Sequence, residues 1–147
     1  MKINLLKGRL GKHRFHLMLV HFPSALYPFS FVMDALSLWL NDPAFGFAAF
    51  YSLTGALGMS VVAMIYGVID FLQIDSKHSA WKTAGLHALL NVSWFIMFSV
   101  LLFYRLKHDV GVVYISVTGL VVVGILFSNY LGGELIVKHK IGIDDRE

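Results

Sequence analysis

Four long apolar segments most strongly restrict what this chain can fold into. They cover about residues 15–40, 45–72, 83–104 and 110–137. A helix needs about 20 apolar residues to cross the hydrocarbon core of a bilayer, and each segment meets this length. Charged residues make up 14% of the chain, whereas soluble domains carry about 25%. The sequence therefore predicts an all-α membrane protein: a four-transmembrane-helix bundle that forms a single membrane domain over residues 1–147.

Proline marks two breaks in this pattern. Pro23 and Pro28 lie inside the first segment and remove two backbone donors, so we expect a kink near its first turns. Asn41, Asp42 and Pro43 form a typical turn sequence, at which the chain should reverse direction before the second segment.

Positive charge is distributed unevenly along the chain. Four spans place both termini on one side of the membrane, together with the loop between the second and third spans. That side holds ten of the twelve Lys and Arg residues, namely Lys2, Lys7, Arg9, Lys12, Arg14, Lys77, Lys82, Lys138, Lys140 and Arg146. The other two loops hold Arg105 and Lys107. Because loops rich in these residues face the cytoplasm, we predict that both termini are cytoplasmic.

Several kinds of chemistry do not fit this chain. It contains no cysteine, which removes disulfides, thiolate nucleophiles and iron–sulfur ligation by its own residues. It has no phosphate-binding loop and no recognisable nucleophile motif. The basic segment before the first span should contact lipid headgroups rather than nucleic acid. We expect an electron carrier or a subunit of a complex more than a stand-alone enzyme.

Polar side chains gather at the side of the membrane that carries the termini. The topology brings together there, from separate spans, His16, His21, Asp70, His87, Asn91, Glu134 and His139. Ionisable side chains inside spans usually face the bundle interior and mark a pathway, a ligand or a cofactor. A single histidine near a helix end is often only hydrogen-bonded or directed to the headgroups. Several histidines from separate helices at one depth favour a shared site.

A haem site is the first chemistry that fits this layer. Imidazoles from two facing helices bind haem iron axially, while the porphyrin packs between the helices. His21 and His87 are the expected axial ligands of a b-type haem. His16 and His139 form a second or alternative pair, so one or two haems would bind.

The surroundings of such a haem follow from the same layer. Hydrogen bonds that fix the imidazole tautomers are expected from Asp70, Asn91 and Glu134. Cations lie where the haem propionates would emerge, namely Arg14, Lys82, Lys12 and Lys138.

A metal site without a porphyrin is the alternative. The histidines would then join Asp70 and Glu134 as mixed nitrogen and oxygen ligands for non-haem iron, zinc or manganese. No helix carries the E-x-x-H pattern of di-iron carboxylate bundles, which disfavours the di-iron version.

Four motifs resemble those of the DUF2231 family, which comprises small four-span bacterial membrane proteins. Residues 13–24, HRFHLMLVHFPS, resemble the family's H-P-L-H-P-x-L-V-H-F-P-I. Residues 67–71, GVIDF, resemble its G-x-I-D-W/F, and residues 86–91, LHALLN, its L-H-A-x-x-N. Residues 131–139, LGGELIVKH, resemble its L-G-G-x-L-V-Y-x-H. These motifs fall on the polar layer and extend over nearly the whole chain.

The match to the first motif is incomplete, because Arg14 and Leu17 replace its two early prolines and Ser24 replaces its isoleucine. Domains of this type occur fused to Rieske-type iron–sulfur domains, so the resemblance implies a redox role in a bacterial inner membrane.

These observations lead to one main hypothesis and two alternatives. In the main hypothesis the chain binds b-type haem near the cytoplasmic face and passes electrons between a quinone or a redox partner protein and a larger chain or complex. In the first alternative it is a structural or accessory subunit whose polar layer only joins helices and binds lipid or a partner. In either case we expect a homo-oligomer or a subunit of a larger complex. In the second alternative it transports or senses a metal or protons, with Asp34 as a polar step across the membrane.

Overall fold

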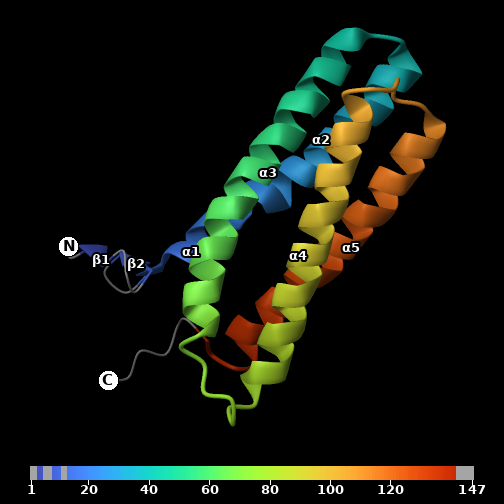
Figure 1. The fold of residues 1–147 in the computed structure, drawn as a ribbon. Coiled ribbons are helices and arrows are strands. Elements are labelled where there is room, and N and C mark those ends of the chain that lie inside the picture. Colours follow the sequence, from blue (N-terminus) through green and yellow to red (C-terminus); the bar gives the residue numbers. More distant parts are fainter. Residues whose placement is uncertain (1–2, 5–7, 11–12, 142–147) are drawn as a thin grey trace.

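Four long helices run side by side, and a small sheet and a short helix precede them (Figure 1). The computed structural model describes residues 3–4, 8–10 and 13–141. All four spans are helical, long and apolar enough to cross a membrane, which confirms the prediction of an all-α, four-span bundle. The bounds are Phe15–Leu19 (α1), His21–Leu40 (α2), Pro43–Phe71 (α3), Ala80–Arg105 (α4) and Val112–Val137 (α5).

The first span is interrupted at Val20, between α1 and α2. Pro23 follows three residues later and lacks the N–H that would bond to the carbonyl of Leu19 in a continuous helix. Pro28 lies inside α2. The kink expected near the first turns is limited to this interruption, because Val20 keeps helical dihedral angles and Ser24 still donates to its carbonyl at 3.1 Å. α1, which carries one of the candidate ligands, thus continues into α2 with one helical hydrogen bond missing.

The turn expected after the first span is present. Asn41 ends α2 in the left-handed conformation, with φ of 52°. The Asp42 side chain accepts a hydrogen bond from the backbone N–H of Ala44 at 2.9 Å, and Pro43 occupies the start of α3. A side-chain acceptor followed by proline is a common way to begin a helix, so this short sequence reverses the chain and starts the second span.

The helices pack as a four-sided bundle in which α2 lies against α3 and α5, and α4 against α3 and α5. Near its centre the rings of Tyr27 and Phe98 stack with centroids 3.8 Å apart. Glycine allows α5 to approach α4 closely, because a Cβ on Gly124 would lie 2.4 Å from the ring of Trp94. Many large apolar side chains remain exposed on the outside of the bundle, as a lipid environment requires.

A three-stranded antiparallel sheet lies before α1, at the end of the bundle where α2 and α4 begin and α3 and α5 end (Figure 1). We call this the termini end. The backbone N–H of Phe15 donates to the carbonyl of Gly8 at 2.8 Å. Gly8 has φ of 63° and lies against Tyr66 of α3. The strands are Ile3–Asn4 (β1), Arg9–Leu10 (β2) and His13–Arg14 (β3).

The sheet was not predicted, because each strand has only two residues and carries no pattern of its own. Within the basic segment expected to contact lipid headgroups, Lys2, Lys7 and Lys12 lie outside the described residues, and so does Arg146 near the C-terminus.

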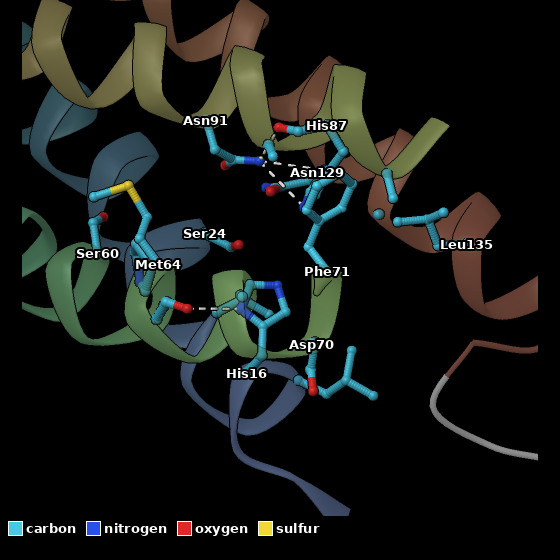
Figure 2. Close-up of a pocket in the computed structure, with 18 of the residues that line it drawn as sticks. His16, Ser24, Ser60, Met64, Asp70, Phe71, His87, Asn91, Asn129 and Leu135 are labelled. Carbon is cyan, nitrogen blue, oxygen red and sulfur yellow. Dashed lines mark hydrogen bonds between the residues drawn. The ribbon is translucent and has the colours of Figure 1, made fainter. Parts of the chain in front are cut away.

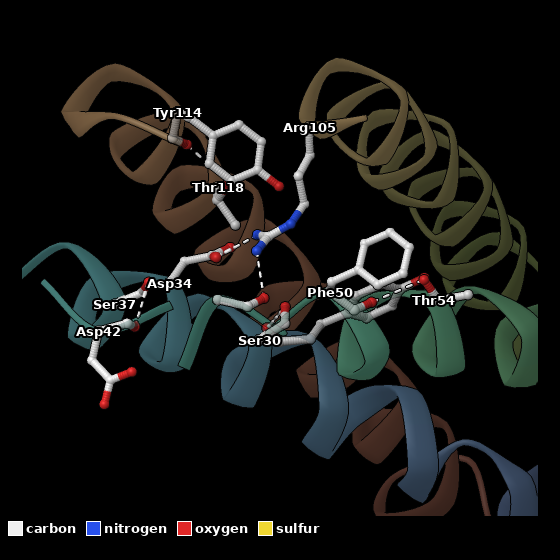
Figure 3. Close-up of polar contacts among 11 residues, drawn as sticks. Ser30, Asp34, Ser37, Asp42, Phe50, Thr54, Arg105, Tyr114 and Thr118 are labelled. Atoms are coloured by element: carbon white, nitrogen blue, oxygen red, sulfur yellow. Dashed lines mark hydrogen bonds and ion pairs between the residues drawn. The ribbon is translucent and has the colours of Figure 1, made fainter. Parts of the chain in front are cut away.

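A buried ion pair joins three helices at the opposite end of the bundle (Figure 3). Arg105 Nη1 donates to Asp34 of α2, and Nη2 donates to the carbonyl of Gly46 in α3 at 2.6 Å. The side chains are only 10% and 2% exposed. The sequence suggested that Arg105 belongs to a loop and that Asp34 is a polar step inside the bundle. The structure instead pairs them, so the carboxylate that the transport alternative needs already has a cationic partner.

Candidate functional site

A mostly apolar cavity of about 400 Å³ lies between the helices at the termini end (Figure 2). Arg14 and Asp70 line it near the termini, and Tyr27 and Ser60 line it deep in the bundle. Along α4 its walls include positions from residue 84 to residue 95, a length of about 16 Å at the helical rise. Cavities of this size hold small molecules and cofactors.

His16 of α1 and His87 of α4 enter this cavity from opposite sides (Figure 2). Their ring centroids are 6.4 Å apart and the ring planes are nearly perpendicular, at 81°. The structure therefore brings together two histidines from different spans, as expected of a shared site, but it pairs His87 with His16.

The hydrogen bonds of these two histidines define their tautomers. His16 Nδ1 lies 2.8 Å from the carbonyl of Ala63, and His87 Nδ1 lies 2.8 Å from the carbonyl of Ser128. A carbonyl oxygen can only accept, so Nδ1 carries the proton in both rings. In a neutral imidazole the other nitrogen, Nε2, then keeps its lone pair. Both rings thus present a potential ligand atom and have their second nitrogen fixed by the backbone.

Asn91 and Ser128 hold the ring of His87 in place. Asn91 Nδ2 donates to the carbonyl of His87 and to Ser128 Oγ, at 2.8 Å in each case. These two bonds use both protons of the amide. The same nitrogen also lies 3.2 Å from His87 Nε2, a contact that a ligand at Nε2 would have to replace. Ser128 was not among the predicted residues, since a serine in an apolar helix carries no functional signal of its own.

Two glycines make room for the imidazoles. A Cβ on Gly67 of α3 would lie 3.0 Å from two atoms of the His16 ring, and a Cβ on Gly132 of α5 would lie 2.9 Å from Cε1 of His87. Each ring thus packs directly against the backbone of a neighbouring helix. Larger residues at these positions would displace the rings, so the glycines help define where the two histidines lie.

The other two candidate histidines lie elsewhere. His21 lines the cavity, but its side chain is exposed, and its Nδ1 contacts the carbonyl of Met18 at 3.3 Å. His139 is not among the residues that line the cavity; its Nδ1 lies 3.1 Å from Ser79 Oγ, and its ring lies 6.4 Å from that of His78. The structure therefore does not bring His139 to His16.

The acidic residues predicted to hydrogen-bond the imidazoles form ion pairs with basic side chains instead. Asp70 accepts a hydrogen bond from Arg14 at 2.8 Å, and both side chains are about nine-tenths buried at the cavity end. Glu134 pairs with Lys138 at 3.0 Å on the surface.

Of the expected propionate partners, Arg14 lines the cavity. Lys82 and Lys138 are exposed and do not line it, and Lys12 lies outside the described residues.

A site with three or more protein ligands does not form in the part of the chain that the structure describes. No group of three His, Asp or Glu side chains there is close enough to hold a metal ion. The arrangement of His16 and His87 provides two imidazoles and an apolar cavity. Two imidazoles suffice for a metal ion whose remaining ligands are supplied by a bound group and not by the protein.

Comparison with known families supports the resemblance seen in the sequence. The sequence model of the DUF2231 family, described as a predicted membrane protein, matches residues 12–145. Comparisons with curated proteins and with solved structures give no match. The matched region contains all five helices and the whole cavity. The chain therefore belongs to the DUF2231 family of predicted membrane proteins.

Proposed function

We propose that this chain binds one b-type haem between His16 and His87 and serves as an electron-transfer protein of the membrane. One observation carries the proposal: two imidazoles from separate spans meet in an apolar cavity, with both Nδ1 atoms bonded to backbone carbonyls. The pair differs from the one expected from the sequence, in which His21 was the partner of His87.

The spacing of the two rings fits a single iron between them. Metal–imidazole bonds are about 2.0–2.1 Å long, so two imidazoles on opposite sides of one metal have centroids roughly 6 Å apart. The observed separation of His16 and His87 is 6.4 Å. Haem iron needs only two axial protein ligands, because the porphyrin supplies the others. The donor set is therefore sufficient for haem, and it is too small for a four-coordinate zinc site.

The second nitrogens of the rings fit metal ligation as well. A metal-bound histidine almost always donates its other N–H to a carbonyl, a carboxylate or water, which fixes the ring and raises the basicity of the ligating nitrogen. Ala63 and Ser128 provide such carbonyls for His16 and His87. Asn91 adds a further restraint on His87. These partners fix the Nδ1 side of both rings, so Nε2 is the atom that would bind iron in each.

The apolar part of the cavity around His16 and His87 would accommodate the porphyrin. Bound haem supplies one-electron chemistry, and the apolar walls would exclude water from it. Arg14 at the cavity end is the residue that would meet a propionate, in exchange for part of its contact with Asp70. By the distribution of Lys and Arg, this end would face the cytoplasm of a bacterial cell, with a quinone or a redox protein as electron partner.

Haem content and the visible spectrum test the proposal. The full chain, expressed with haem supply and purified in detergent, is expected to contain one haem per chain. Reduction with dithionite should give the sharp α-band of a b-type cytochrome. Folded protein without haem and without this band would overturn the proposal and favour the accessory-subunit alternative. Metal analysis on the same sample covers the non-haem iron and zinc alternatives.

Gly132→Ala is expected to weaken haem binding about tenfold while leaving the helices intact. The added Cβ would lie 2.9 Å from Cε1 of His87, and such overpacking costs about 1–3 kcal/mol. Haem titration of the purified variant measures the effect. Gly133→Ala is the matched control, since a Cβ there would meet nothing within 4 Å. Equal haem affinities of the two variants would contradict this account of the His87 position.

A further inference from the structure

Part of the cavity wall carries polar side chains that have no partner. Ser24 of α2 and Asn129 of α5 line the cavity (Figure 2), and neither side chain makes a hydrogen bond within the described part of the chain. His21 also lines it, and because its Nδ1 faces the Met18 carbonyl, its Nε2 keeps a free lone pair. Polar groups in an apolar cavity cost free energy unless a ligand or water satisfies them.

These residues lie where the cavity reaches the outside of the bundle. His21 at the start of α2 and Gly133 near the end of α5 both line the cavity and are both exposed. A Cβ on Gly133 would meet nothing within 4 Å. Both residues belong to helices that are long and apolar enough to span a membrane, so a ligand could reach this opening from the bilayer. Other exposed lining residues are Val68 of α3 and Val92 of α4, which offer no hydrogen-bonding side chain.

The free groups define the chemistry of a ligand. The Asn129 amide and the Ser24 hydroxyl can each donate and accept, and His21 Nε2 accepts. A ligand that enters from the bilayer must be mostly apolar, yet it must offer oxygens that both accept and donate. A quinone ring accepts through its carbonyls, and its reduced form also donates through its hydroxyls. The ester groups of a phospholipid only accept, so they cannot donate to His21 Nε2 as the hydroxyl of a reduced quinone can.

We propose that the opening between the start of α2 and the end of α5 binds the ring of a membrane quinone. Ser24 and Asn129 would donate to its carbonyls, and His21 Nε2 would accept from a hydroxyl of the reduced form. The role of this quinone as electron partner rests on the proposed haem function, whereas binding of the ring does not. The site lies on the same cavity as His16 and His87, which places the ring beside the position proposed for the haem.

Calorimetric titration of the full chain with decylubiquinone in detergent tests the proposal. Protein prepared with and without haem is titrated, so that quinone binding is measured independently of haem content. Asn129→Leu and Ser24→Ala are each expected to lower the affinity about three- to tenfold, the effect of one lost hydrogen bond. Ser116→Ala is the matched control: Ser116 is also a serine in a span, but it is exposed and bonds to the carbonyl of Val112.

The outcomes separate this proposal from the haem proposal. Saturable quinone binding that both variants weaken and the control does not supports the site, whether or not the preparation contains haem. Absent binding, or binding that Asn129→Leu and Ser24→Ala leave unchanged, overturns it even when haem is present in full. Displacement of the quinone by a short-chain phosphatidylcholine at comparable concentration also overturns it, because the opening would then be a lipid site.

Discussion

Alanine in place of His16 or His87 is expected to lower the haem content of the purified protein at least tenfold. Loss of the residues around a metal ligand typically costs 10- to 100-fold in affinity, and loss of the ligand itself should cost at least as much. The two ring centroids lie 6.4 Å apart, and both Nδ1 atoms are bonded to backbone carbonyls. His21 also lines the cavity, but its side chain is exposed and its Nδ1 lies beside the carbonyl of Met18, so it does not occupy the position of either ring. Pyridine haemochrome analysis gives the haem content.

His139→Ala provides the matched control for this prediction. His139 also lies at the termini end, but it does not line the cavity, and it contacts Ser79 instead. The variant is expected to keep a full haem content and an unchanged reduced spectrum. Haem loss in His139→Ala together with haem retention in His16→Ala would show that His16 is not the ligand.

Asp34→Leu is expected to destabilise the protein by about 3–5 kcal/mol, because it leaves the guanidinium of Arg105 buried without its counter-charge. The pair is a suitable test, since its side chains are only 2% and 10% exposed and it connects α2, α3 and α4. Denaturant unfolding in detergent, followed by circular dichroism, measures the change. The cavity lies at the other end of the bundle, so the folded fraction should keep its haem.

The double variant Asp34→Leu/Arg105→Leu separates the pair from the individual charges. Replacing both members of a buried pair by apolar residues is often neutral, so the double variant should recover most of the stability lost in Asp34→Leu. Glu134→Gln is the control at an exposed pair, where the loss should stay within about 1 kcal/mol. A double variant less stable than Asp34→Leu would contradict the view that pairing is the main role of these two residues.

The helices and the end of the bundle that carries the site follow from sequence patterns. Long apolar segments define the spans regardless of tertiary contacts, and Asn41, Asp42 and Pro43 define a turn through local chemistry. Antiparallel connectivity then places His16 and His87 at one end, since one begins the first span and the other begins the third.

The choice of partner within the layer could not be predicted. His16 and His21 are five residues apart, which on a helix places them on different faces. When a span is apolar on all sides, its sequence does not indicate which side of the helix faces the interior of the bundle. Which of the two histidines faces His87 therefore depends on tertiary packing, as does the pairing of Asp34 with Arg105 across 71 positions.

Electron paramagnetic resonance of the oxidised, haem-loaded protein tests ligation by His16 and His87 most directly. Two imidazole ligands make ferric haem low-spin, and a near-perpendicular arrangement, as in the 81° between these rings, makes the signal strongly anisotropic. The account predicts this low-spin signal in the wild-type protein and in His139→Ala, and its loss in His16→Ala and His87→Ala. A high-spin signal in the wild-type protein, or a low-spin signal that survives in both alanine variants, would contradict it.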